Sequence, residues 1–247
     1  RCYIYSAKGY RDNLLTAIHQ SQFLPWIPYF FKILKSDIFV VLDDVQYQKN
    51  GLQNRNQIKT PQGPHWLTIP VKMKLGDKIN EVKITNSKSM DNILKTIEHN
   101  YKKSPFFNDA YSLVESVLHK HNKLLIDINN ELLMGVLDLI GMSPRIRYSS
   151  HIKTTHAKDD LVIEIIKYFG EKQYLSGKGA LNYMDLNKFK KEGISVFTYD
   201  CECVEYPQQW NRQQGFISNL SILDLVLNGL SKASGYIHDN GTVKLLE

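Results

Sequence analysis

The chain has 247 residues, of which 43% are hydrophobic and 23% are charged. This composition is that of an ordinary globular protein and excludes a largely disordered chain. The formal net charge of +6 fits phosphate-bearing ligands, and it fits an ordinary solvated surface equally well. The three cysteines, Cys2, Cys201 and Cys203, have no second Cys or His pair at zinc-ligand spacing. We therefore expect neither a disulfide framework nor a structural zinc site.

Membrane and export signals are not apparent in the sequence. No signal peptide opens it, and no apolar run approaches the length of a membrane span. The sequence therefore predicts a soluble protein of the cytoplasm that does not insert into a membrane. It leaves the oligomeric state open.

Short apolar runs and helical periodicity alternate in the first part of the chain, and residues 1–13 carry no pattern that we assign. The expected elements, in chain order, are a strand at 14–18, a helix at 29–34, a strand at 38–42, a polar loop at 43–63, and strands at 66–71 and 81–85. The first three have the size of a βαβ unit, whose crossover is expected to be right-handed.

Helical periodicity dominates the middle of the chain, and alternation of strands and helices then resumes. The expected elements are helices at 90–101, 110–119 and 124–140, a strand at 145–148, a helix at 161–169, a strand at 173–175, a helix at 186–191, a strand at 195–199 and a helix at 221–230. This order predicts an α/β fold with a mostly parallel sheet flanked by helices. We expect one domain over residues 14–247, with a helical block at about 88–142 as a subdomain or insertion.

Three polar clusters directly follow predicted strands, which matters because ligands bind at the carboxyl ends of strands in open α/β sheets. They contain His19 and Gln20; Asp43, Asp44, Gln46 and Tyr47; and Ser176, Gly177, Lys178 and Gly179. His19 can serve as a general base or a phosphate contact. One of the two aspartates can bind Mg²⁺ or orient an amine. The Ser-Gly-Lys-Gly run has the parts of an anion cradle without being a P-loop. Each cluster is also compatible with an ordinary polar turn.

The segment 53–60 has an unusual density of amides and cations, and a solvated loop seldom needs them. Its candidate ligand-binding residues are Asn54, Arg55, Asn56 and Lys59. Nucleic acid is a rival ligand, but no basic stripe and no nucleic-acid motif favour it. We expect His19, Asp44 and Arg55 to line one cleft, since all lie just beyond predicted strands or in the loop that follows one.

Several segments together resemble the WbqC-like family, in order along almost the whole chain. They include residues 17–26, 36–47, 53–60, 63–71, 174–179, 206–208 and 219–224. Each segment is weak alone, and the ordered set is specific. The family typically has Pro where this chain has Ser21, often Gly where it has Pro28, and Pro where it has Lys178. The last difference adds a charge to the predicted site.

The family is associated with O-antigen gene clusters, so the resemblance implies a role in surface polysaccharide synthesis. One proposal makes its members glycine transferases that acylate an amino sugar. For this chain, the resemblance implies an enzyme that transfers an aminoacyl group to an amino sugar or nucleotide-linked amino sugar. The acyl donor and cofactor stay open, with ATP and Mg²⁺ as one option if the acyl group is activated in place, and no protein metal site is predicted. An ATP-dependent adenylylating ligase and a non-catalytic sugar-nucleotide-binding module are the alternatives.

Overall fold

The computed structural model describes residues 14–85, 88–120, 123–201 and 204–246. Residues 1–13, with Cys2, and Cys203 therefore lie outside the described residues. The main sheet has six strands in the order β10-β9-β8-β1-β2-β7. Their bounds are β1 Leu15–Gln20, β2 Ile38–Leu42, β7 Ile146–Tyr148, β8 Gln173–Leu175, β9 Ser195–Cys201 and β10 Gly241–Leu245.

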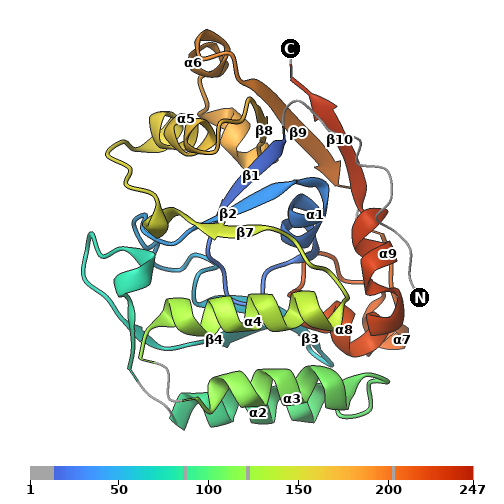
Figure 1. Cartoon of the computed structure of the whole chain (residues 1–247). Helices are drawn as coiled ribbons and strands as arrows, with labels where there is room; N and C mark the ends of the chain where they lie inside the picture. The colour runs from blue at the N-terminus through green and yellow to red at the C-terminus, as the bar shows by residue number, and fades with distance from the viewer. Residues whose placement is uncertain (1–13, 86–87, 121–122, 202–203, 247) are drawn as a thin grey trace.

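The main sheet is parallel except at one edge. Strand β1 pairs in parallel with β2 and with β8, and β2 with β7 and β8 with β9 are parallel as well, whereas β10 runs antiparallel to β9. The chain passes from β1 to β2 on one side, and β8 later joins β1 on the other. The predicted α/β class with a mostly parallel sheet is thus confirmed, and the strand order reverses at β1 (Figure 1).

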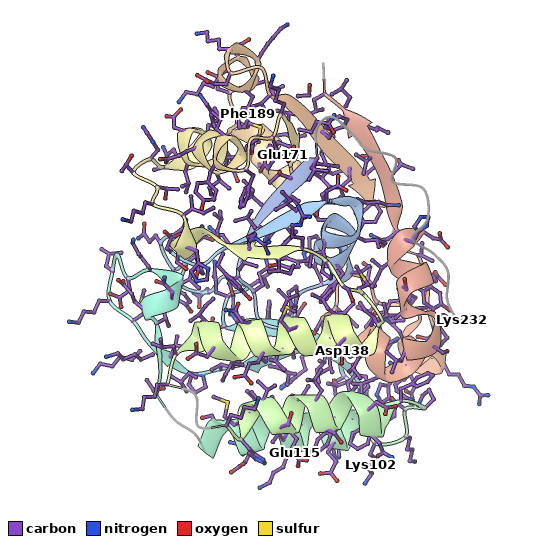
Figure 2. All side chains as sticks on the ribbon, viewed as in Figure 1. Lys102, Glu115, Asp138, Glu171, Phe189 and Lys232 are labelled. Atoms are coloured by element: carbon purple, nitrogen blue, oxygen red, sulfur yellow. The ribbon has the colours of Figure 1, made fainter. Side chains whose placement is uncertain are left out.

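Helices cover both faces of this sheet (Figure 1). Their bounds are α1 Ile27–Lys35, α2 Lys88–Tyr101, α3 Phe107–Leu118, α4 Leu125–Leu139, α5 Lys158–Tyr168, α6 Leu186–Lys191, α7 Asn211–Gln214, α8 Ile222–Gly229 and α9 Ala233–His238. Helices α5 and α6 lie on one face, and α1, α4 and α8 on the other. The α2–α3 pair forms an outer layer beyond α4, and Lys102 and Glu115 lie on its outer side (Figure 2).

Alternation along the strands divides the buried side chains between the two faces. Ala17 and Phe39 belong to the larger core with α1, α4 and α8, whereas Ile18 and Val40 belong to the smaller core under α5. In the smaller core the Phe189 ring of α6 stacks on Tyr174 at a centroid distance of 5.8 Å (Figure 2). Nearby, the Glu171 carboxylate accepts a hydrogen bond from the Leu14 N–H at 2.6 Å, which anchors the entry to β1.

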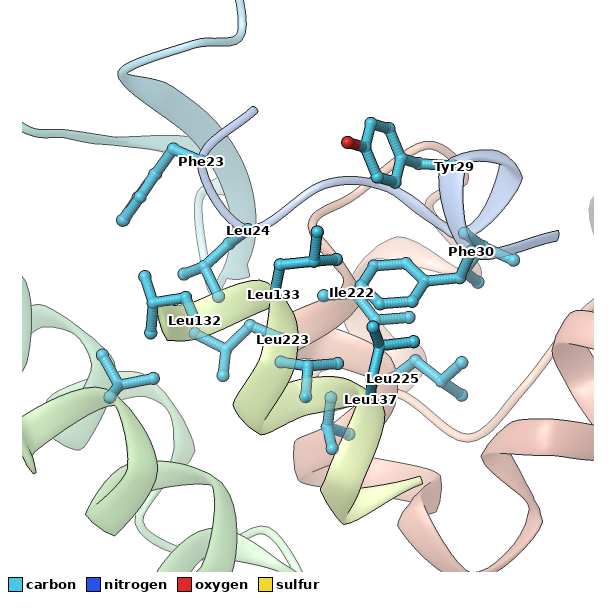
Figure 3. Close-up of a cluster of buried hydrophobic side chains, with 14 of the residues drawn as sticks. Phe23, Leu24, Tyr29, Phe30, Leu132, Leu133, Leu137, Ile222, Leu223 and Leu225 are labelled. Atoms are coloured by element: carbon cyan, nitrogen blue, oxygen red, sulfur yellow. The ribbon is translucent and has the colours of Figure 1, made fainter. Parts of the chain in front are cut away.

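The larger core joins α1 to the helices below the sheet. Figure 3 shows Phe30 of α1 among Leu133 and Leu137 of α4 and Ile222 of α8. Burying a side chain of this size stabilises the fold by about 1.5–3 kcal/mol. This packing fixes α1 against the sheet, and with it every side chain that α1 carries toward the carboxyl ends of the strands.

Two short hairpins, not one polar loop, connect β2 to the helical block. The predicted loop 43–63 contains β3 Arg55–Thr60, which pairs with β4 Gly63–Thr68, so that part of the prediction is wrong. The predicted strand 66–71 is divided between β4 and β5 Val71–Lys72, and β5 pairs with β6 Lys83–Ile84. Pro70 separates the two pieces, and proline has no N–H to donate to a strand ladder.

Helix lengths also bear on the membrane question. None of the helices in the described ranges is both long and apolar enough to span a membrane.

Candidate functional site

A cleft of about 1750 Å³ opens where the strand order reverses. The carboxyl ends of β1, β2, β8 and β9 form its base, through residues that include Gln20, Leu42, Gly177 and Tyr199. The pairing of β1 with β8 ends at Ala17–Leu175, whereas its pairing with β2 continues to Gln20–Leu42. From Ile18 onward β1 therefore has an open edge on the β8 side. Ligands of open α/β sheets bind at such a point.

His19 lies in this cleft as an uncharged imidazole. Its Nδ1 is 3.1 Å from the Gln20 carbonyl, which can only accept, so Nδ1 carries the proton, and no described residue donates to the Nε2 lone pair. Burial, followed by the charge of Lys32, lowers the pKa of His19 to about 3 against a smaller opposing effect of the Gln20 carbonyl. The ring also packs edge-on against Tyr29, with centroids 4.8 Å apart. His19 thus presents a fixed hydrogen-bond acceptor rather than a cation.

Gln20, next to His19, is held by the segment before β3. Gln53 Nε2 donates to Gln20 Oε1 at 2.9 Å, and Asn129 of α4 donates to the Gln53 carbonyl at 2.9 Å. The free amide nitrogen of Gln20 is then the group that it can offer to a ligand. Both predicted residues of the first cluster line the cleft.

The two aspartates after β2 have different surroundings. Asp43 is buried and accepts hydrogen bonds from the Ser150 N–H at 2.9 Å and the Ser150 hydroxyl at 2.6 Å. Asp44 is half-buried, lines the cleft and contacts the Ser149 hydroxyl through Oδ1. Among the described residues no partner lies at Asp44 Oδ2. Asp43 therefore holds the turn after β7, and Asp44 is the aspartate that can meet a ligand.

Gln46 and Tyr47 line the cleft on a segment fixed from the other side. The Tyr47 N–H donates to the Asp77 carbonyl and the Ile79 N–H donates to the Val45 carbonyl, both at 2.9 Å. Burial raises the pKa of Tyr47, against the opposing charge of Arg55. The Tyr47 hydroxyl therefore stays protonated at neutral pH and can donate a hydrogen bond.

The third cluster is split between the core and the cleft. Ser176 is fully buried and does not line the cleft, whereas Gly177, Lys178 and Gly179 do. Lys178 Nζ lies 2.6 Å from Asp200 Oδ1, and this contact and a second one from Lys244 lower the pKa of Asp200 to about 2. Lys178 thus faces the cleft with its ammonium paired to Asp200, whose single negative charge it shares with Lys244.

The residues predicted in the segment 53–60 lie apart from the cleft lining. Asn54 and Asn56 are buried, and each donates a hydrogen bond to a backbone carbonyl, at 2.8 Å to Ile69 and 2.7 Å to Leu24. Lys59 is fully buried too, and its Nζ donates to Gln208 Oε1 at 3.0 Å and Asn211 Oδ1 at 2.7 Å. These contacts join β3 to its surroundings.

Arg55 is also outside the cleft lining, although it was expected to share a cleft with His19 and Asp44. Its guanidinium lies over the Trp66 ring, 4.4 Å from the centroid, and donates to the Asn50 carbonyl. The register of the hairpin, in which Arg55 pairs with Thr68 and Gln57 with Trp66, brings the two side chains together on one face. The structure thus brings His19 and Asp44, but not Arg55, to one cleft.

Among the described residues, lysines exceed acids around the cleft. Five lysines line it, Lys32, Lys49, Lys78, Lys158 and Lys178, against the two aspartates Asp44 and Asp159. The Asp159 carboxylate is itself occupied by the Asp185 N–H at 2.9 Å. Lysines around a recess attract anionic ligands such as phosphates. In the described part of the chain no group of three or more His, Cys, Asp and Glu side chains is placed to hold a metal ion.

The comparisons with known proteins agree with this architecture. The sequence pattern of the WbqC-like protein family matches residues 20–235. The chain belongs to the WbqC-like protein family. It is 32% identical over 225 residues to the uncharacterized protein Rv1507c of Mycobacterium tuberculosis, an alignment that covers 90% of this chain and 96% of that protein. No solved structure matches.

Lys32 of this WbqC-like chain is a cleft residue that the sequence patterns did not indicate. It lies on α1, is 1% exposed, lines the cleft and donates to the Ile18 carbonyl at 2.6 Å. The available signal was a single lysine between Phe31 and Ile33 in an otherwise apolar run. Ser149 and Ser150 were missed as well, although they follow the predicted strand 145–148 as the three polar clusters follow theirs.

Proposed function

We propose that the protein is a transferase that acylates the amino group of an amino sugar, carried on a nucleotide, with an aminoacyl group such as glycyl, for surface polysaccharide synthesis. The observation that carries the proposal is the presence of an uncharged His19 and the Asp44 side chain in one lysine-rich cleft at the strand switch point. Membership of the WbqC-like family supports it.

The chemistry requires an amine to attack an activated carbonyl carbon. The amine forms the C–N bond and loses a proton, and the tetrahedral intermediate expels the donor's leaving group with its electron pair. Asp44 Oδ2, left open by the Ser149 contact on Oδ1, takes the proton of the amine. His19 Nε2 accepts a hydrogen bond from the same amine and orients its lone pair. The contact with the Gln20 carbonyl fixes the His19 ring, which suits an orienting acceptor.

The remaining predicted residues then divide by place. Gln20, Gln46 and Tyr47 contact the sugar, and the backbone of Gly177 and Gly179 with Lys178 contacts phosphate. Asp43 and Ser176 support these segments from the core. Asn54, Arg55, Asn56 and Lys59 act through the β3–β4 hairpin instead of by direct contact.

Mass spectrometry of reaction mixtures tests the proposal. Nucleotide-linked amino sugars are incubated with glycine and ATP, or with a pre-activated glycyl donor, and the acceptor is expected to gain one glycyl group. Asp44→Asn should lower kcat by about two to four orders of magnitude, the usual contribution of a general base. His19→Gln should lower kcat with little change in KM.

The same experiment separates the alternatives. Glycine-dependent release of pyrophosphate from ATP identifies a ligase that activates the acyl group in place. Tight binding of a nucleotide sugar without any acylated product, across all donors, identifies a binding module and overturns the transferase.

A further inference from the structure

Lys32 is a buried amine at the open edge of β1. Its Nζ donates to the Ile18 carbonyl at 2.6 Å, at the first residue of β1 that β8 no longer pairs. The side chain runs from α1 through the core to the cleft wall, and the residue is only 1% exposed. An ammonium has three N–H donors, and the Ile18 carbonyl occupies one of them. No described residue accepts a hydrogen bond from the other two.

Lys32 differs from the other buried lysine, Lys59, in how its charge is compensated. Lys59 donates to two side-chain oxygens and to the Gly215 carbonyl, so its three N–H groups are used within the protein. No carboxylate lies within ion-pair distance of Lys32 among the described residues. Buried charges are normally paired, and one that is left unpaired costs free energy.

We propose that Lys32 forms the base of a phosphate subsite at the open edge of β1, and that a phosphate-bearing ligand binds there together with a proton taken up by the Lys32 amine. The inference rests on the proposed function in taking the ligand to be a nucleotide-linked sugar. A phosphate, and not a single carboxylate, fits because Lys49, Lys78 and Lys158 line the same cleft. The negative charge of the bound phosphate then acts as the counterion that Lys32 lacks among the described residues.

Burial lowers the pKa of Lys32 to about 7, so near pH 8 the free protein holds this amine largely uncharged. A bound phosphate opposes that effect, since an opposite charge nearby favours the protonated amine. Ligand binding and proton uptake are then linked, and the ligand binds more tightly as the pH falls toward 7.

Other titratable groups at this edge have to be separated from Lys32. Those on the surrounding elements are His19 on β1, Asp44 after β2, Tyr174, Lys178 and Tyr183 around β8, Tyr199 and Cys201 on β9, Tyr29 on α1, His156 before α5, and Lys158 and Asp159 on α5. The pKa of His19 is about 3, that of Tyr174 is raised to about 12 by burial, and that of Lys178 is raised by Asp200. None of these three changes its charge near pH 8. The variants Asp44→Asn, Cys201→Ser and His156→Gln measure how much of the proton uptake comes from Asp44, Cys201 and His156.

Isothermal titration calorimetry tests the proposal on the full chain with UDP, dTDP, CDP and GDP as probes. The titrations are run at about pH 8 in two buffers of different ionisation enthalpy, which gives the number of protons taken up. We expect close to one proton per bound nucleoside diphosphate for the wild type. Absence of proton uptake in the wild type with every probe overturns the subsite, independently of any variant.

Lys32→Met then assigns the proton. We expect it to abolish the uptake and to weaken binding about tenfold or more, as the loss of a charge-assisted hydrogen bond does. Lys35→Met is the matched control on the same helix, because Lys35 lies over the Phe31 ring and not in the cleft lining. Unchanged uptake and affinity in Lys32→Met overturn the proposal. Lys32-dependent uptake with glycine alone, and with no nucleotide, does the same and identifies a carboxylate subsite.

These titrations contain no acyl donor, so their result is independent of turnover. Lys32-dependent uptake in a protein that acylates no acceptor supports the subsite and counts against the transferase. Acyl transfer without Lys32-dependent proton uptake supports the transferase and counts against the phosphate subsite.

Discussion

Ser149 donates its hydroxyl proton to the carboxylate of Asp44 across the junction of β7 and β2. The same Oγ also lies 3.1 Å from Asp43 Oδ1 and accepts the Asp43 N–H at 3.2 Å. A hydroxyl has one proton, so the two carboxylates compete for it. Asp43 has Ser150 as a further donor, which leaves the Ser149 proton to fix Asp44.

Ser149→Ala should therefore lower kcat for acyl transfer by up to about 100-fold, because a displaced catalytic group loses its alignment with the substrate. It should also lower the free energy of unfolding by about 1–3 kcal/mol, since the buried Asp43 N–H loses its acceptor. Ser150→Ala is the control: it removes a contact to Asp43 alone, so stability should fall while kcat stays near that of the wild type. Equal effects of the two variants on kcat would contradict this role of Ser149.

A second relationship links β3 to two helices through a buried tyrosine. The Tyr101 hydroxyl accepts the Lys59 N–H at 2.8 Å and donates to Asp224 Oδ1 at 2.6 Å. Tyr101→Phe leaves both partners buried, so we expect the free energy of unfolding to fall by about 1.5–3 kcal/mol. Urea titration measures it. Tyr111→Phe on α3, whose ring stacks on Phe107 at 4.8 Å, should change stability little; a similar loss in both variants would contradict the role of the chain of hydrogen bonds.

The titration of Lys32 predicts how stability depends on pH. Its pKa is about 7 in the folded protein and 10.5 in a solvated chain, so between these values the unfolded state holds more protons. Stability from this group rises with pH across that window and is lowest below pH 7. Lys32→Met should thus stabilise the protein near pH 7, by about 1–4 kcal/mol, as apolar replacements of buried charges do.

The stabilisation should shrink as the pH is raised toward about 10, because protonation of the amine favours the unfolded state less and less as the pH approaches its unfolded pKa of 10.5. Urea unfolding of the two proteins at about pH 7 and about pH 9.5 measures the change. Lys95→Met on the exposed side of α2 is the control and should show no such trend. A constant difference between Lys32→Met and the wild type at both pH values would be inconsistent with a buried amine.

The elements of the fold were predicted best where the periodicity of apolar residues is strong. Strand 38–42 was predicted with the bounds that β2 has, and helix 124–140 differs from α4 by one residue at each end. The strand β3 was missed because the amides and cations of the segment 53–60 indicated a ligand-binding loop, whereas in the structure the interior supplies the hydrogen-bond partners of Asn54, Asn56 and Lys59. A sequence gives the polarity of a side chain but not the acceptor that compensates it.

The candidate site was also predicted only in part. The rule that polar residues after parallel strands share one edge predicts that His19, Asp44 and Gly177 lie together, and all three line the cleft. The rule could not find Lys32, which comes from the buried face of a helix and reaches the edge through its long side chain. It also misplaced Arg55, because a hairpin register and not a strand end decides where that side chain lies.

Asp200 limits what Lys178 can contribute to the cleft. Lys178 and Lys244 both contact its carboxylate, and they hold its pKa at about 2, so this acid stays ionised between about pH 5 and 8. Asp200→Asn removes the negative charge that Lys178 shares with Lys244. We therefore expect nucleoside diphosphates to bind several-fold more tightly, with a steeper loss of affinity in salt because one more cation contributes.

Calorimetric titrations at two ionic strengths measure both effects of Asp200→Asn. The melting temperature should change little, since these ion pairs are solvent-exposed and exposed pairs contribute little to stability. Glu192→Gln is the matched control, because it breaks a comparable surface pair with Lys167, whose Nζ lies 2.6 Å from Glu192 Oε2, away from the cleft lining. If Asp200→Asn binds nucleotides no better than Glu192→Gln, Lys178 does not contact the phosphate, and the anion is held by Lys32 and the other lysines of the cleft.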